Sequence, residues 1–145
     1  MAAFQFFDEF VKYIGDGTID LDSHTFKAVL SNTAPTRGTD TVLANITQIA
    51  GTFGYTTGGQ TLTSVTWSET GSGTGIWRWN CADFSWTASG GDLTFRYVVI
   101  YDDTPTSPAD PLVGMFDYGS SVIIPDGSIF TVDVSADGIF ETNHS

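Results

Sequence analysis

The chain of 145 residues is strongly acidic, with 17 Asp and Glu against 5 Lys and Arg and a net charge of −12. The basic residues form no cluster, which disfavours nucleic acids and anionic membranes as partners because both are bound through Lys and Arg. A hydrophobic content of 41% excludes a disordered composition. The length fits a single domain over residues 1–145, and the many Thr, Ser and Gly residues favour strands and turns.

A short helix is predicted near the start of the chain, over residues 4–14. Phe7, Phe10, Val11 and Ile14 recur at intervals of three and four residues, which places them on one helix face. Glycines directly after this segment end the helix. A helix of about eleven residues is marginally stable alone, so we expect this apolar face to dock on the rest of the protein.

After residue 17 apolar and polar residues alternate, which indicates β-strands. The expected strands are 24–30, 65–68, 77–81, 93–101, 113–116, 122–124, 130–134 and 139–140. Turns that contain Gly or Pro separate them. In a long early connection, residues 39–49 carry apolar residues at helical spacing, which predicts a short second helix or turn.

This pattern predicts a mainly β fold, an antiparallel β-sandwich of jelly-roll-like form with a short N-terminal helix. We expect at least six antiparallel strands in two sheets. The residues that alternate on the apolar faces of these strands are predicted to form the core: Trp67, Trp79, Phe95, Tyr97, Val99, Val132 and Val134.

The single cysteine, Cys81, excludes a disulfide within the chain and is predicted to be a small buried apolar residue. The alternative role, a nucleophile, has no histidine near it in the sequence. The sequence contains no run of about 18 apolar residues, so no transmembrane helix is predicted. Acidic residues lie near the start, where a signal peptide needs basic ones. We therefore expect the protein to be made in the cytoplasm and not exported by a signal peptide.

Two acidic groups are the candidates for a cation site. The first consists of Asp16, Asp20 and Asp22, and the second consists of Asp102, Asp103 and Asp110. The first group departs from the calcium-loop pattern at its third and sixth positions, so solvated turns are favoured over calcium for both groups. His24 and His144 are too few for a metal site, and the Gly-x-Ser-x-Gly motif of a serine hydrolase does not occur. No catalytic, cofactor-binding or metal-ligating residue is predicted.

The four tryptophans, Trp67, Trp77, Trp79 and Trp86, admit three interpretations. Alternating aromatic residues fill the core of a sandwich, and this interpretation is favoured. The same residues are also typical of an aromatic platform that binds sugars. A third alternative is a partner interface, because Trp and Tyr are enriched at buried contact centres.

Phe4, Phe6 and Phe7 are the predicted interface residues. They spread around more of the predicted helix than a docking stripe requires. Copies with a charge of −12 repel one another, so self-association requires a dry apolar patch. These residues are predicted to supply it in a dimer or trimer. The alternative is that all three pack beneath their own domain.

Five segments resemble those of a group of tailed-bacteriophage virion proteins, the capsid cement or decoration type. They are 17–31, 54–62, 82–88, 95–102 and 111–114, and their order and spacing cover nearly the whole chain. The resemblance implies small β-sandwich or jelly-roll oligomers on the outside of a phage head. It implies a binding and structural role without catalytic residues, and no functional residue carries over.

The first functional hypothesis is therefore a homo-oligomer that binds the major capsid protein on the outer surface of the virion and reinforces the shell. It would be synthesised in the host cytoplasm. The second is a tail-associated module that binds carbohydrate or a receptor through Trp and Tyr side chains. A small hydrolase that uses one of the Asp groups has the least support.

Overall fold

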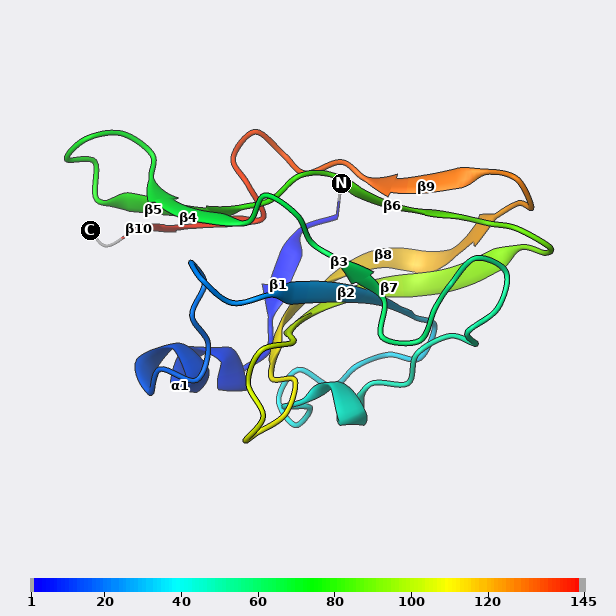
Figure 1. Cartoon of the computed structure of the whole chain (residues 1–145), viewed down its shortest axis with the longest axis horizontal. Coiled ribbons are helices and arrows are strands. Elements are labelled where there is room, and N and C mark those ends of the chain that lie inside the picture. The colour runs from blue at the N-terminus through cyan, green and yellow to red at the C-terminus, as the bar shows by residue number, and fades with distance from the viewer. Residues whose placement is uncertain (1, 144–145) are drawn as a thin grey trace.

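The computed structural model describes residues 2–143 and is mainly β, with one short α-helix (Figure 1). The strands are β1 (Phe4–Phe6), β2 (Phe26–Ser31), β3 (Gln60–Thr61), β4 (Thr66–Glu69), β5 (Ile76–Asn80), β6 (Phe84–Thr87), β7 (Leu93–Asp102), β8 (Leu112–Ile124), β9 (Ile129–Val132) and β10 (Phe140–Asn143). The α-helix is α1 (Glu9–Gly15), and a 3₁₀ helix covers Leu43–Asn45. Every pairing between these strands is antiparallel.

The strands form three sheets rather than the two predicted from the sequence. The largest has the order β1-β8-β7-β2-β3, the second has the order β10-β5-β4, and the third contains β6 and β9. Both smaller sheets lie over the same face of the five-stranded sheet (Figure 1). The prediction of a mainly antiparallel β fold with one short helix is confirmed. The smaller sheets do not close with the large one, so the sandwich or jelly-roll form stays a prediction.

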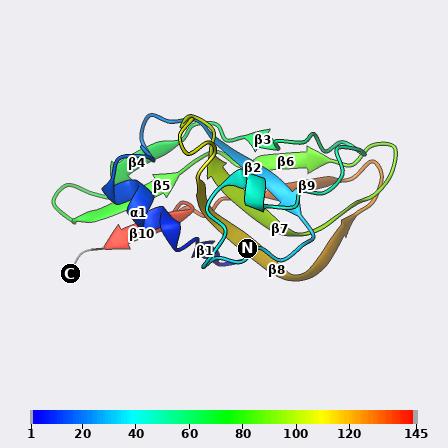
Figure 2. The same cartoon turned by 90° about the horizontal axis from the view of Figure 1, so that it is seen from below.

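The core lies between these layers. Phe26 of β2 packs against Trp79 of β5 with ring centroids 4.8 Å apart, and Phe95 of β7 packs at the same distance against Phe130 of β9. The long connection between β2 and β3, which includes the 3₁₀ helix, covers much of the opposite face of the five-stranded sheet (Figure 2). The centre of β7 is therefore buried on both sides.

Five of the seven predicted core residues are buried: Trp79, Phe95, Tyr97, Val99 and Val132. The prediction is wrong for Trp67 and Val134, which are only partly buried. Trp67 lies on β4, the edge strand of the three-stranded sheet, and Val134 lies just beyond the end of β9. At both positions the opposing layer covers less of the side chain.

The helix predicted over residues 4–14 is wrong in its first half. Phe4–Phe6 is a strand because its backbone pairs with β8, and α1 begins only at Glu9. The buried face of α1 is also rotated from the predicted one: Phe10 and Tyr13 are buried, whereas Val11 is 73% exposed and Ile14 is 40% exposed.

Among the other elements, the predicted strands 113–116 and 122–124 belong to one long strand, β8. A bulge interrupts its pairing with β7, because Phe95 pairs with Val122 while Tyr97 pairs with Asp117. The strands β1, β3 and β6 were not predicted. The helical pattern over residues 39–49 corresponds to the 3₁₀ turn at Leu43–Asn45.

Candidate functional site

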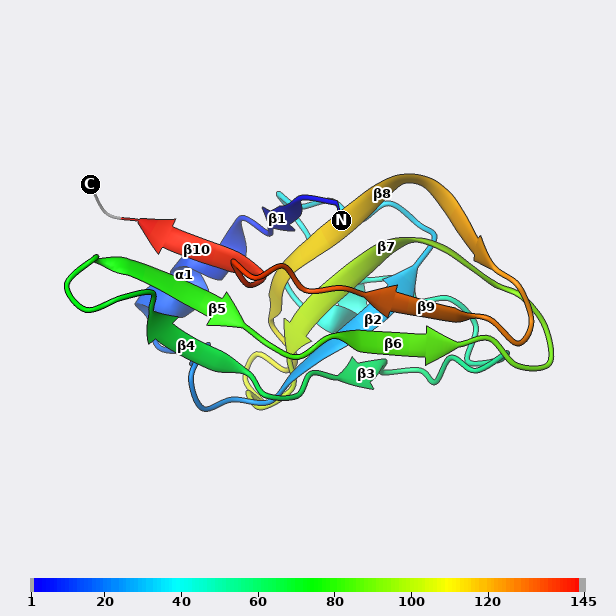
Figure 3. The same ribbon diagram turned by 90° about the horizontal axis from the view of Figure 1, so that it is seen from above.

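The three-stranded sheet of β10, β5 and β4 extends past the end of the five-stranded sheet and is the candidate binding region (Figures 1 and 3). Its register places Trp67, Trp79 and Phe140 side by side in one row across the sheet. Trp79 of this row is fully buried against Phe26 of β2, because the five-stranded sheet lies directly beneath it. This row anchors the small sheet to the core.

The next row along the same face consists of Glu69, Trp77 and Thr142. Trp77 is 38% exposed, and its ring stacks on that of Trp67 with centroids 5.8 Å apart. The carboxylate of Glu69 accepts hydrogen bonds from the backbone N–H of Gly75 at 2.8 Å and of Gly73 at 3.4 Å. The row therefore combines an accessible indole surface with a carboxylate that is held in place by the β4–β5 turn.

Only part of the four-tryptophan prediction describes an accessible surface. Trp86 is buried between Phe84 and Phe130, and the indole N–H of Trp79 donates to the backbone carbonyl of Leu21 at 3.1 Å. The core interpretation is confirmed for these two tryptophans. The accessible tryptophan surface is restricted to Trp67 and Trp77.

The predicted interface residues lie in an aromatic cluster near α1. The ring of Phe6 stacks on Phe10 of α1, and Phe4 and Phe6 both contact Phe140 of β10. Phe4 and Phe6 are half-buried in this cluster, while Phe7 is fully buried and presents no surface to a second copy. The contact role of Phe4 and Phe6 stays a prediction.

Two exposed apolar residues of α1, Val11 and Ile14, were assigned to the docking face by the sequence pattern but point to solvent. Tyr13 takes the buried position instead, and its hydroxyl donates to the carbonyl of Thr41 at 3.2 Å. The helix therefore offers an uncovered apolar strip close to the cluster of Phe6 and Phe10. In the sequence, the signal for this exposed strip is that the segment has more apolar residues than one docking face of a helix needs.

His24 and Asp102, which are 78 residues apart in the sequence, form a close pair. Nδ1 of His24 lies 2.6 Å from Oδ2 of Asp102, whose side chain is fully buried. The other carboxylate oxygen accepts from the backbone N–H of Thr104. Burial raises the pKa of Asp102, and the hydrogen bond from His24 opposes this shift. Within residues 2–143, no hydroxyl or thiol group hydrogen-bonds to the His24 ring, so the arrangement contains a histidine and its acid without an adjacent nucleophile.

The acidic residues of the first group are held in turns. Asp16 accepts hydrogen bonds from the hydroxyl and the backbone N–H of Thr18, which lowers its pKa. Asp20 accepts from the Ser23 hydroxyl and from the backbone N–H of Asp22, with the same effect on its pKa. In the described part of the chain, no group of three or more His, Cys, Asp or Glu side chains has an arrangement that fits a metal ion.

In the second acidic group, burial is the largest cause of a raised pKa for Asp110, and the neighbouring charge of Asp103 adds to it. Lys27 lies 3.6 Å from the carboxylate of Asp103. These contacts close the loop between β7 and β8 against β2. His144, the second histidine, lies outside the described residues.

Cys81 is buried, as predicted. Burial raises the pKa of its thiol to about 12, and the nearby charge of Asp83 adds to this shift. The thiol is therefore protonated at neutral pH, whereas a nucleophilic cysteine reacts as the thiolate.

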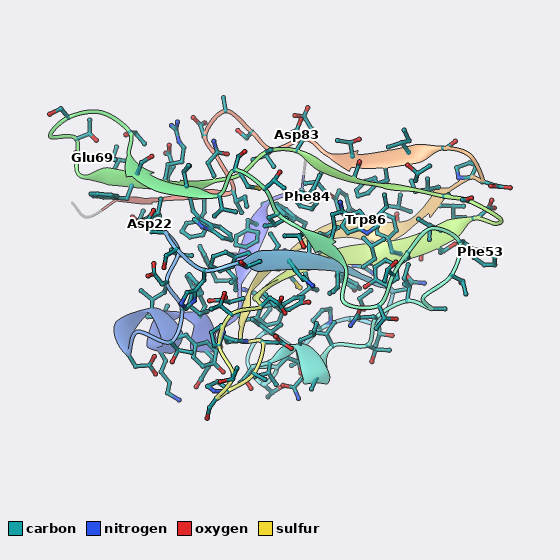
Figure 4. The ribbon with its side chains drawn as sticks, in the orientation of Figure 1. Asp22, Phe53, Glu69, Asp83, Phe84 and Trp86 are labelled. Atoms are coloured by element: carbon teal, nitrogen blue, oxygen red, sulfur yellow. The ribbon has the colours of Figure 1, made fainter. Side chains whose placement is uncertain are left out.

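A small pocket of about 150 Å³ lies at the other end of the molecule from α1, where Phe53 is placed in Figure 4. It is lined by Ile49, Ala50, Thr52, Phe53, Asp92, Leu93 and Thr94. Sites for drug-sized ligands have volumes of about 300–1,000 Å³ and several converging polar groups. This pocket is smaller, and Asp92 is the one charged residue in its lining.

Comparison of the chain with known protein families, with curated proteins and with solved structures finds no match. No helix in the described residues is long and apolar enough to span a membrane.

Proposed function

We propose that the chain is a structural protein of a tailed-phage virion that binds the outer surface of the capsid and reinforces it. The observation that carries the proposal is the three-stranded sheet that extends past the core with Trp67 and Trp77 incompletely covered. Partly exposed tryptophans at the margin of a rigid scaffold are typical of protein–protein contact centres. The sequence resemblance supplies the capsid as the partner.

The layered architecture supports this proposal. A β-sandwich or jelly-roll-like domain is the fold that the resemblance implies, and two small sheets stacked over a larger one approach that arrangement. The buried Trp79 anchors the three-stranded sheet of β10, β5 and β4 (the projecting sheet) to the five-stranded sheet, and an anchored binding surface loses less conformational entropy when it binds.

We further propose that the protein acts as a dimer or trimer. A net charge of −12 opposes self-association, so the contact requires apolar surface. Val11 and Ile14 on α1, together with the half-buried Phe4 and Phe6, supply such surface in one region. Added salt should favour assembly, because at 0.1 M it screens exposed charges separated by more than about 10 Å.

The proposal is tested by sedimenting purified protein with capsids of the encoding phage. Trp77→Ala removes the accessible indole, and we expect at least about a tenfold loss of binding. Ile129→Ala is the matched control, because Ile129 is an exposed apolar residue on β9, outside the projecting sheet. Equal binding by both variants, or no binding of the unaltered protein, would contradict the proposal.

The second candidate is a tail-associated module that binds carbohydrate or a receptor. The stacked pair Trp67 and Trp77 favours it, because sugar rings pack on exposed indole faces. Titration with bacterial surface polysaccharides, followed by tryptophan fluorescence, distinguishes the two candidates. Saturable quenching that is lost in Trp77→Ala, without capsid binding, would favour the tail module.

A further inference from the structure

The outer edge of β4 carries backbone groups that point away from the sheet. The N–H of Thr70 donates to the carbonyl of Ile76, which fixes the phase of the alternating hydrogen bonds between β4 and β5. The backbone N–H and C=O groups of Thr66, Ser68 and Thr70 therefore point toward β5. The N–H and C=O groups of the intervening residues, at positions 67 and 69, face outward, where no other described strand pairs with them.

This edge is longer than the two edges of the five-stranded sheet and equal in length to the edges β6, β9 and β10, from which it differs by the tryptophan and the acidic residues around it. In the five-stranded sheet, the edge strands β1 and β3 are only three and two residues long. β4 has four residues, no proline and a single charged side chain, Glu69. Short length, proline and charge are the usual devices that protect an edge from a further strand. The edge of β4 uses them sparingly, and it adjoins the partly exposed Trp67.

The charges around this edge indicate what kind of strand it accepts. The β4–β5 turn holds the Glu69 carboxylate at one end of β4. Asp20 and Asp22 are exposed on the loop whose Leu21 carbonyl accepts from the indole of Trp79, so this loop lies beneath the sheet (Figures 3 and 4). A second copy would bring the same acidic residues to this edge, and like charges placed together disfavour that pairing.

We propose that the outer edge of β4 binds an extended basic segment of another protein, which adds to the sheet as a fourth strand. Its backbone pairs with the outward groups of Trp67 and Glu69, an apolar side chain packs on Trp67, and a Lys or Arg faces Glu69. Addition of a strand to an exposed edge is a recurrent mode of peptide recognition. The inference deepens the proposed function by naming the contact, and the partner segment would belong to the shell protein.

The test uses isotope-labelled full-length protein and synthetic peptides, so it does not require capsids. The probe is a capped peptide of about eight residues that alternates Val and Lys. Controls are the same peptide with Glu in place of Lys, and with N-methyl groups on alternate residues to block backbone pairing. The Val–Lys peptide should shift the NMR amide signals of Trp67 and Glu69, whereas neither control should do so.

Two variants test the role of charge. Glu69→Lys should lower the affinity for the Val–Lys peptide by about tenfold or more, because it places like charges at the site. Since Glu69 also holds the β4–β5 turn, Asp22→Lys provides a second variant that leaves this turn intact and should weaken binding in the same direction. Asp133→Lys is the matched control with the same change in net charge at an exposed residue beyond β9, and it should alter affinity less than about twofold.

The inference is overturned if the peptide signals map to the edge of β9 or β10, or if Asp133→Lys weakens binding as much as the other two variants. It is also overturned if the amides of Trp67 and Glu69 shift with protein concentration alone, which would make a second copy the occupant. Peptide binding at β4 without capsid binding would contradict the proposed function and leave this inference standing. Capsid binding without peptide binding would support the proposed function and overturn this inference.

Discussion

The β7–β8 pair and the β4–β5 pair are both antiparallel hairpins of this chain, but they differ in how they are covered. From Tyr97 to Asp102, every residue of β7 is buried, because one face lies beneath the small sheets and the other beneath the long connection after β2. In β4, no residue is fully buried. In β5, full burial is confined to Trp79.

This difference separates stability from binding. Apolar surface that is removed from water stabilises the fold by about 25 cal/mol per Å², so the β7–β8 pair contributes more to the free energy of folding than the β4–β5 pair does. A partly covered strand pair supplies less, and it retains surface and backbone groups that a partner can use. Under the proposed function, the first region holds the protein together and the second contacts other molecules.

The largest expected effect is on the side of β7. Phe95→Ala empties a fully buried site that contacts Phe130 and Tyr118, and loss of a buried Phe costs about 3–5 kcal/mol in the free energy of unfolding. Thr94→Ala, at the neighbouring exposed position, is the control and should change it by less than about 0.5 kcal/mol. Urea denaturation measures both. Equal effects would show that this face of β7 is not the stabilising core.

Trp77→Ala should affect stability less, because the side chain is incompletely buried. We expect the free energy of unfolding to fall by about 1–2 kcal/mol, with the contacts of Trp79 retained. The buried tryptophan serves as the comparison: Trp79→Ala should cost about 3–5 kcal/mol. If denaturation curves gave the same loss in the free energy of unfolding for Trp77→Ala as for Trp79→Ala, the row of Trp77 would be as important for stability as the row of Trp79, which would contradict the comparison.

A smaller effect should depend on pH. Because burial raises the pKa of Asp102 above its ordinary value of 3.8, its stabilising contribution is fully present below that value and is lost as the pH rises through the raised pKa. Asp102→Asn keeps an acceptor for the N–H of Thr104 but does not titrate. The stability of the unaltered protein relative to Asp102→Asn should therefore fall across this pH window. A rise in the same window would contradict the assignment.

The smallest effect is expected on the outer face of the projecting sheet. Arg78 of β5 donates to Glu141 of β10 at 2.6 Å, with both side chains partly exposed to solvent. Such exposed pairs contribute about 0–1 kcal/mol, so Arg78→Met should shift the thermal midpoint by only a few degrees. A loss as large as that of Phe95→Ala would show that this sheet depends on the ion pair rather than on the row of Trp79.

The sequence was sufficient to predict the strands that carry strong alternation, such as β5 and β7, because their pattern follows directly from the burial of one face. It was misleading at Phe4–Phe6, which the prediction joined to the helical pattern that starts at Phe7, whereas their backbone pairs with β8, more than 100 residues later. Alternation in β6 was present but brief, with Phe84 and Trp86 buried between Ser85 and Thr87.

The candidate site was predictable in composition rather than in geometry. Four tryptophans stood out in the sequence, but the pattern alone does not say that the opposing sheet covers Trp79 and ends before Trp77. The pairing of His24 with Asp102 likewise depends on tertiary contacts between distant segments. In both cases the missing information is where one layer of the fold stops covering another.

The most direct test is a cryo-electron microscopy reconstruction of phage capsids incubated with the purified protein. The account predicts ordered density on the outer surface, with the β4–β5 hairpin and Trp77 against the shell and the β7–β8 pair away from it. Density in which the three-stranded sheet faces solvent, or capsids that remain bare at saturating protein, would contradict the assignment of this sheet to binding.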